Sequence, residues 1–111
     1  IYDNEEIINA ITTDSDKLKL LTPYDVTVSA PSKDFDCASR YFWPANGGDE
    51  DSVTGSIHTG LAPYWAEKLN KQQIVALQAS KRSGIVYCEV NDNRVKISGD
   101  AVQYLTGTIT I

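Results

Sequence analysis

The stretch that decides the fold is residues 55–69, which read GSIHTGLAPYWAEKL. Apolar residues recur in it at intervals of four, the spacing of one face of an α-helix. Its first half carries no formal charge, so we expect a helix that is buried on most sides. Pro63 deletes one backbone hydrogen bond, and we expect a kink there or a helix that restarts at this residue. The apolar face consists of Ile57, Leu61, Trp65 and Leu69.

Strand-like runs lie on both sides of this helix. Before it come Tyr24–Ala30, which has the period-two pattern of a half-buried strand, and Phe35–Trp43, which is rich in aromatic residues. Two short helices, Glu5–Ile11 and Asp14–Leu21, come earlier still. The order predicts an α+β domain in which an antiparallel or mixed sheet curls around one apolar helix. The strands that we expect after the helix are Ile74–Ala79, Ile85–Val90, Arg94–Ser98 and Ala101–Ile111.

The residues that open the long helix are candidates for binding an anion. Gly55 starts a turn whose backbone N–H groups lack acceptors within the helix, and the helix dipole adds positive potential there. Such a turn suits a carboxylate or a phosphate, which Gly55 allows to approach closely. Thr54 or Ser56 would donate a hydroxyl to the ligand or cap the helix. On spacing alone, a simpler interpretation stays open, in which Thr54 is only a cap.

Asp51 lies just upstream of this turn, beside Asp49 and Glu50. Adjacent like charges and partial burial both raise the pKa of a carboxyl group, which suits general acid or base work. Asp51 is therefore the candidate catalytic residue, although these acids could merely keep a loop solvated. His58, the only histidine, lacks partners at metal-ligand spacing, so we expect a structural role and no metal site.

Arg40 and a set of aromatic residues each have both a functional and a structural interpretation. Arg40 could bind a substrate carboxylate, but an ion pair with one of the loop acids is the simpler expectation. Aromatic side chains could stack on a substrate, and we favour core packing for them. These are Tyr41, Phe42, Trp43 and Trp65.

Length, net charge and residue content limit the classes of protein to which this chain can belong. At 111 residues the chain is a single domain, residues 1–111, and its net charge of -5 argues against a nucleic-acid partner. It has no signal peptide and no apolar run that could span a bilayer, so we expect a cytoplasmic protein without a membrane partner. Cys37 and Cys88 lie in apolar runs and should be free thiols. Because the chain starts at Ile1 and has no Met, we expect a fragment or a processed product.

Five runs of the chain, in order, resemble motifs of the phenazine-biosynthesis PhzF-like family. A collinear set of this kind is far more specific than any single motif. Two positions depart from the family pattern: Ser52 stands where Pro is usual, and Ser83 replaces the first Gly of an Arg-Gly-Gly turn. The five runs are Phe35–Pro44, Glu50–His58, Leu61–Leu69, Gln78–Gly84 and Arg94–Val102.

The resemblance implies the diaminopimelate-epimerase-like fold, in which two similar lobes each wrap a sheet around a central helix. It also implies an isomerase that uses no cofactor and moves a proton across a small unsaturated acid bound between the lobes. This chain resembles the C-terminal lobe alone. By position, Asp51 would assist proton transfer or hold the substrate. Thr54, Gly55 and Ser56 would bind its carboxylate, while the other lobe carries the principal acid–base Glu.

Three functions follow as hypotheses. The first is one lobe of such an isomerase, inactive or weak without its N-terminal lobe, whose ligand is a small carboxylic acid. The second is a homodimer, in which two copies dock about a two-fold axis and bind a small acid without catalysis. The third is a degenerate structural or interaction domain.

Overall fold

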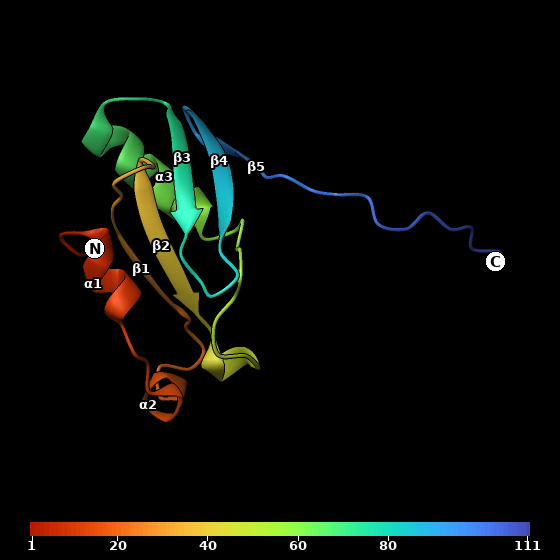
Figure 1. The fold of residues 1–111 in the computed structure, drawn as a ribbon, viewed down its shortest axis with the longest axis horizontal. Coiled ribbons are helices and arrows are strands. Elements are labelled where there is room, and N and C mark those ends of the chain that lie inside the picture. The colour runs from red at the N-terminus through yellow and green to blue at the C-terminus, as the bar shows by residue number, and fades with distance from the viewer.

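The computed structural model describes residues 1–111 and has the expected α+β architecture (Figure 1). Five of the six expected strands and all three expected helices are present, with ends that differ by a few residues. A single 3-10 turn, η1, was not expected. In chain order, the elements are α1 (Glu5–Ala10), α2 (Ser15–Lys19), β1 (Val26–Pro31), β2 (Cys37–Phe42), η1 (Pro44–Asn46), α3 (His58–Leu69), β3 (Gln73–Gln78), β4 (Gly84–Asn91) and β5 (Arg94–Ser98).

The strands form one mixed sheet in the order β1-β2-β3-β4-β5. Three of its neighbouring pairs are antiparallel, and the β2–β3 pair is parallel. A parallel pair needs a long crossover, because the chain must return to the end at which it started. Residues 43–72 form this crossover, which carries η1, the candidate site and α3.

The main core lies between α3 and one face of the sheet (Figure 1). Trp65 is only 2% exposed, and its indole Nε1 donates a hydrogen bond to Ser29 Oγ at 2.9 Å. Phe42 is also buried, so core packing is confirmed for these two aromatic residues. The buried residues of this core are Cys37, Leu61, Ala62, Trp65, Ile74, Ala76, Val86 and Cys88.

α3 begins at His58, three residues after the predicted start. The preceding turn is tighter than an α-helix, since the His58 N–H donates to the Gly55 carbonyl, 3.1 Å away. The helix continues through Pro63, so the predicted restart at that residue is wrong. Its buried neighbours Leu61 and Trp65 pack against the sheet and hold the helix across the missing hydrogen bond.

α1 packs on the opposite face of the sheet, against β1 and β2. Asn4 caps it by accepting a hydrogen bond from the Ile7 N–H at 3.0 Å. Ile8 is the buried residue of α1, and it contacts Ala30 and Ala38. The two helices α1 and α3 therefore cover different faces of the sheet, and α1 covers its β1–β2 end.

The predicted strand Ala101–Ile111 is wrong. These residues have no regular structure and run away from the domain as an extended segment (Figure 1). Their alternating pattern favours a strand, but a strand exists only where a neighbouring backbone pairs with it. None of their backbone groups is hydrogen-bonded to the domain.

Both cysteines are free and buried, as predicted. Burial raises the pKa of the Cys37 thiol to about 12 and that of the Cys88 thiol to about 11. Neither thiol is therefore suited to act as a nucleophile. The chain has no helix with the length and hydrophobicity that crossing a bilayer requires.

Candidate functional site

The candidate site is the Asp51 loop, residues 51–57, which connects η1 to the N-terminal end of α3. The sheet fixes the start of this loop, because the Asp51 N–H donates to the Tyr41 carbonyl in β2 at 3.0 Å. The helix fixes its end, since the loop runs directly into His58. The loop therefore joins the two layers of the core at one edge of the domain.

The backbone N–H groups of Gly55, Ser56 and Ile57 have no acceptor within the chain, as the sequence predicted. Gly55 and Ser56 are exposed, and no side chain caps the helix at Ile57. These donors lie at the positive end of the 12-residue helix α3. The arrangement can bind an anion such as a carboxylate.

Asp51 is partly buried and holds one defined orientation. Its Oδ2 accepts a hydrogen bond from the Thr54 hydroxyl at 2.6 Å, whereas Oδ1 has no partner within the chain. One carboxylate oxygen is thus tied to the loop, and the other remains available. A carboxyl group held in this way can exchange a proton with a ligand without first having to be oriented.

Thr54 orients Asp51 and does not cap the helix. Its hydroxyl donates to Asp51, and its backbone N–H donates to the side-chain oxygen of Gln78 at 2.7 Å. Both of its donors are therefore used within the chain. The expected direct contact between Thr54 and a substrate stays a prediction.

Gln78 supports the loop from the end of β3, and the sequence analysis assigned it no role. Its side chain is fully buried, and its Nε2 donates to the Asp51 carbonyl at 3.0 Å and to Thr54 Oγ1 at 3.1 Å. A signal was present, because Gln78 ends the apolar run IVALQ, and a buried amide in a strand needs partners. The identity of those partners was not visible in the sequence.

His58 has the structural role that was expected. It is fully buried, its Nδ1 is 2.7 Å from the Thr54 carbonyl, and its Nε2 is 3.4 Å from Ser39 Oγ. A neutral ring with the proton on Nδ1 satisfies both contacts. Burial lowers the pKa of His58, although the hydrogen bond to Thr54 acts in the opposite direction. His58 therefore ties the start of α3 to the loop and to β2.

Arg40 forms the expected ion pair with a loop acid. Its Nε and Nη2 donate to the two carboxylate oxygens of Glu50 at 2.7 and 3.1 Å. Its Nη1 also donates to the carbonyls of Ile8 and Ile11 at the end of α1. Glu50 is thus neutralised, and Asp49 accepts a hydrogen bond from Ser15 at 2.7 Å. Among the three consecutive acids Asp49, Glu50 and Asp51, only Asp51 contacts the residues that lead into α3.

The family model described as phenazine biosynthesis-like protein, PhzC-PhzF, matches residues 2–107. The chain belongs to this family. Two uncharacterized isomerases of Pseudomonas aeruginosa are 46% identical over 109 residues and 41% identical over 111 residues. A phenazine biosynthesis PhzC/PhzF protein from Clostridium difficile superposes with a TM-score of 0.86 at 43% identity, over 98% of this chain.

The chain spans about 42% of the length of these PhzF relatives. Its five-stranded mixed sheet and helices match one lobe of the PhzF structures. A PhzF family protein from Enterococcus faecalis gives the same result, with a TM-score of 0.83 over 89% of this chain and 38% of the other. The organisation expected from the motifs, one lobe of a longer protein, is in accord with these lengths.

The two departures from the PhzF motifs lie side by side. Ser80 Oγ donates to the Ser52 carbonyl at 2.7 Å and accepts from the Ser83 N–H at 3.0 Å. The hydroxyl of Ser80 therefore holds the loop at the position where Pro is usual. Ser83 has a φ of 56°, in the left-handed region that glycine adopts at little cost. The backbone here thus keeps a conformation that suits the glycine of the family motif.

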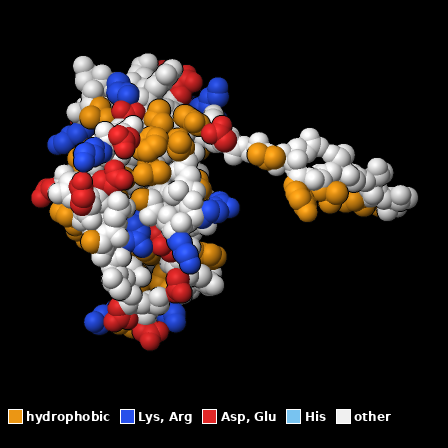
Figure 2. Space-filling view, in the orientation of Figure 1, with side chains coloured by type: hydrophobic (Ala, Val, Ile, Leu, Met, Phe, Trp, Pro, Cys, Tyr) orange, Lys and Arg blue, Asp and Glu red, His pale blue; other side chains and the backbone are white.

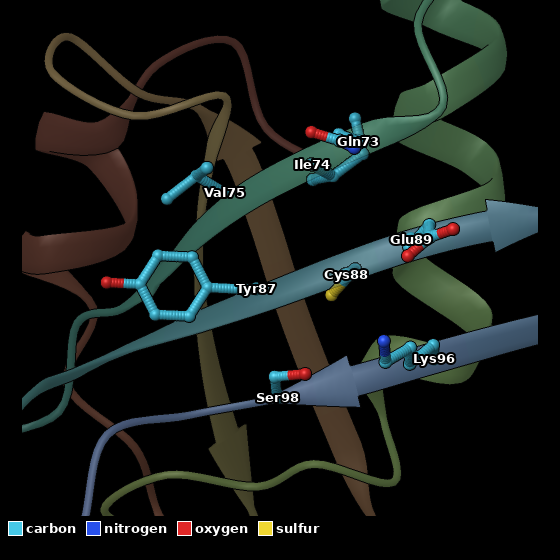
Figure 3. A pocket seen from close by; sticks show the side chains of 8 residues that line it. All are labelled: Gln73, Ile74, Val75, Tyr87, Cys88, Glu89, Lys96 and Ser98. Atoms are coloured by element: carbon cyan, nitrogen blue, oxygen red, sulfur yellow. The ribbon is translucent and has the colours of Figure 1, made fainter.

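A separate hollow of about 160 Å³ lies on β3, β4 and β5 (Figure 3). It includes Gln73, at the end of β3 opposite to Gln78, and therefore lies away from the Asp51 loop. No cluster of three metal-ligating side chains is present there or elsewhere in the chain. The residues that line the hollow are Gln73, Ile74, Val75, Tyr87, Cys88, Glu89, Lys96 and Ser98.

Proposed function

We propose that this chain is the carboxylate-binding lobe of a PhzF-like isomerase. The observation that carries the proposal is the position of Asp51, whose carboxylate has one free oxygen, beside the unbonded N–H groups of Gly55 and Ser56. A small acid whose carboxylate accepts hydrogen bonds from Gly55 and Ser56 would lie next to Asp51. The Ser56 hydroxyl, which has no partner within the chain, adds a further donor.

The proposed reaction moves a proton and needs no cofactor. A base removes a proton from one carbon of an unsaturated acid, the double bond shifts, and an acid returns a proton to a second carbon. No electrons are gained or lost by the molecule. The helix N-terminus stabilises the carboxylate, and also the extra negative charge that spreads into it when the carbon loses its proton. Asp51 is one of the two proton-transferring groups, and the complementary lobe supplies the other.

Binding can be tested on this chain by itself. Crotonate, a small unsaturated acid, is added to the ¹⁵N-labelled chain, and the amide signals are followed by NMR. We expect saturable shifts at Gly55, Ser56 and Ile57. Crotonamide, which has nearly the same shape and no charge, is the control and should cause no such shifts. Equal shifts with both compounds, or none with crotonate, would refute the carboxylate site.

Catalysis is tested after the missing lobe is restored. The chain is co-expressed with the part of the 46% identical Pseudomonas relative that it does not match. Deuterium uptake from D₂O into a panel of small unsaturated acids reports proton transfer. Asp51→Asn should lower the uptake rate by about 100-fold or more, a normal contribution of one general acid or base. Asp49→Asn, two residues before Asp51, should leave the rate within about three-fold. If Asp51→Asn is as active as the wild type, the catalytic role of Asp51 is wrong.

A further inference from the structure

Asn46 is the last residue of η1, and Gly47 follows it. It is the only asparagine of the chain that precedes a glycine. Asparagine is among the chemically labile residues of proteins. The glycine matters because no Cβ shields the backbone nitrogen that lies next to the asparagine side chain. The pair Asn46–Gly47 therefore combines a reactive side chain with an accessible backbone nitrogen.

The backbone around Gly47 leaves this nitrogen free to react. Its N–H has no hydrogen-bond acceptor within the chain, and Gly47 has a φ of 117°, which glycine adopts at little cost. A Cβ on Gly47 would meet no atom within 4 Å, so the main chain has room to move there. Asn46 and Gly47 are both exposed, and a hollow of about 330 Å³ beside Gly47 gives water access to the pair.

The side-chain amide of Asn46 fastens η1 to the start of β1. Its Nδ2 donates to Asp25 Oδ1 at 2.8 Å and to the Pro23 carbonyl at 3.4 Å. The other oxygen of Asp25 accepts from the Tyr41 hydroxyl at 2.6 Å. Asp25 has no ion-pair partner, so neutral donors alone stabilise its charge. Figure 2 shows further acidic side chains at the end of the molecule where α2 lies.

We infer that Asn46 is a site of spontaneous deamidation and that its products release η1 from β1. The Gly47 nitrogen bonds to Asn46 Cγ, the bond from Cγ to Nδ2 breaks, and ammonia leaves with the proton of the Gly47 N–H. Water then opens the succinimide ring at either of its two carbonyls, which leaves aspartate or isoaspartate at position 46. The reaction consumes one water, releases one ammonia and transfers no electrons.

Either product removes the donor that Asp25 uses. A carboxylate then stands where Nδ2 donated across 2.8 Å, and two carboxylates without a cation between them repel each other at that distance. Isoaspartate also lengthens the main chain by one carbon. This extra carbon lies inside the turn that the Asn46 N–H closes by donating to the Trp43 carbonyl at 3.0 Å.

The turn that carries Asn46 leads directly into the Asp51 loop. Residues 43–49 form a compact loop, which the Trp43 N–H closes by donating to the Asp49 carbonyl at 3.1 Å. Only Asn46 and Asp49 join this loop to other elements through side-chain hydrogen bonds, and the partner of Asp49 is Ser15. Deamidation removes one of these two connections and so loosens the segment before Asp51. This inference does not depend on the proposed function.

Mass spectrometry of the chain, incubated for weeks at neutral pH, follows the reaction. Trypsin releases residues 41–68 as one peptide, in which Asn46 is the only Asn or Gln, so the replacement of an amide by a carboxyl group is assigned without ambiguity. Peptide 83–94 is the control, because its Asn91 and Asn93 are exposed but no glycine follows them. Asn46 should react at least about ten times faster than either. Equal rates would overturn the inference.

Gly47→Ala tests the attacking nitrogen. The added methyl group should slow the reaction of Asn46 by at least about ten-fold, both in the native chain and in urea, where any effect on the fold is removed. An unchanged rate in urea would mean that the amide is lost by another route, and the proposed reaction would be wrong.

Asn46→Asp tests the consequence for the loop. The Trp43 amide should exchange with solvent at least about ten times faster than in the wild type. Adding Asp25→Asn exchanges the roles of the two partners, because asparagine at position 25 can accept from Tyr41 and donate to the new carboxylate. This double variant should restore slow exchange. If the single variant exchanges like the wild type, or the double variant as fast as the single one, the release of η1 is wrong.

Discussion

Gln78 and Thr54 are joined by two hydrogen bonds, although they are 24 positions apart in the chain. The Thr54 N–H donates to Gln78 Oε1 at 2.7 Å, and Gln78 Nε2 donates to the Thr54 hydroxyl at 3.1 Å. The same hydroxyl donates to Asp51 Oδ2 at 2.6 Å. The orientation of the candidate catalytic carboxylate is therefore set by a buried amide at the end of β3.

Gln78→Leu should destabilise the domain and loosen the loop. Leucine cannot accept the Thr54 N–H, and an unsatisfied buried donor costs about 1–3 kcal/mol. We expect the free energy of unfolding in urea to fall by about 2 kcal/mol. Gln73→Leu makes the same change at an exposed position of β3 and should stay within about 0.5 kcal/mol. If the two variants are equally stable, the hydrogen bonds of Gln78 do not contribute to the stability of the domain.

Arg40→Met should be strongly destabilising. It leaves the Glu50 carboxylate without its ion-pair partner and removes the side-chain donor to the carbonyls of Ile8 and Ile11, and the Arg40 and Glu50 side chains are only 14% and 21% exposed. We expect a loss of about 2–4 kcal/mol in urea unfolding.

The control for Arg40→Met is Lys17→Met. This change removes an ion pair with Asp14 whose side chains are 80% and 53% exposed. It should change the free energy of unfolding by no more than about 0.5 kcal/mol. A comparable loss in both variants would show that the Arg40 pair has no special role.

The stability of the domain should decrease as the pH falls below the ordinary pKa of histidine. Burial lowers the pKa of His58 in the folded protein, so the unfolded chain takes up the proton first. The contribution of neutral His58 is complete above about pH 6.5 and is lost as the pH falls toward the lowered value. One proton gives a slope of at most about 1.4 kcal/mol per pH unit.

His58→Gln isolates this effect, because the chain contains no other histidine. The variant should be less stable at pH 7.5, but its unfolding free energy should change less between pH 7 and pH 5.5 than that of the wild type. If the unfolding free energies of the wild type and the variant change equally with pH, the pKa of His58 is not lowered in the folded protein.

Ser83→Gly should stabilise the domain. Ser83 has a φ of 56°, which costs a residue with a Cβ about 1 kcal/mol, and glycine avoids this cost. Its N–H can still donate to Ser80. We expect a gain of about 0.5–1 kcal/mol in thermal or urea unfolding. Ser52→Gly, at a position without positive φ, should lower stability instead.

Cys37 and Cys88 should resist thiol reagents in the folded protein. With pKa values raised to about 12 and about 11, their thiolate fractions at pH 8 are about 10⁻⁴ and 10⁻³. Ellman's reagent should therefore react with neither within minutes at pH 8, and with both after denaturation in guanidinium. Rapid reaction of a native thiol would mean that the core opens readily at that position.

The sequence predicted the elements that local patterns specify. Helical periodicity identified α3, alternation identified β1, and strand-like composition between turn residues identified β2 to β5, because all these patterns arise within a single segment. The prediction of a strand over Ala101–Ile111 was wrong for the same reason. The alternation of residues 101–111 specifies a strand, but only a neighbouring sheet edge could form one, and local patterns hold no information about such an edge.

In the candidate site, too, the features set by local sequence were predicted and those set by distant contacts were not. The free amides of Gly55 and Ser56 follow from their position before a helix and were predicted. The roles of Gln78 and Ser80 depend on contacts across the β2–β3 crossover and were not predicted. The start of α3 at His58 was not predicted either. In the turn at Gly55 the His58 N–H donates to the carbonyl three residues earlier, whereas in an α-helix it would donate to the carbonyl four residues earlier, and local sequence does not distinguish the two.

The parallel pairing of β2 with β3 has a consequence for the order in which the domain folds. The hairpins β1–β2 and β3–β4–β5 can form from neighbouring segments, but β2 meets β3 only after the 30 residues between them have folded back. Contacts across so long a connection carry the largest entropic cost and form late. Gln78 lies in β3 and holds Asp51, which lies within this connection, so the Asp51 loop takes its final form only after β2 and β3 have paired. A carboxylate that binds to this loop would therefore report on the finished fold and not on a partly folded form.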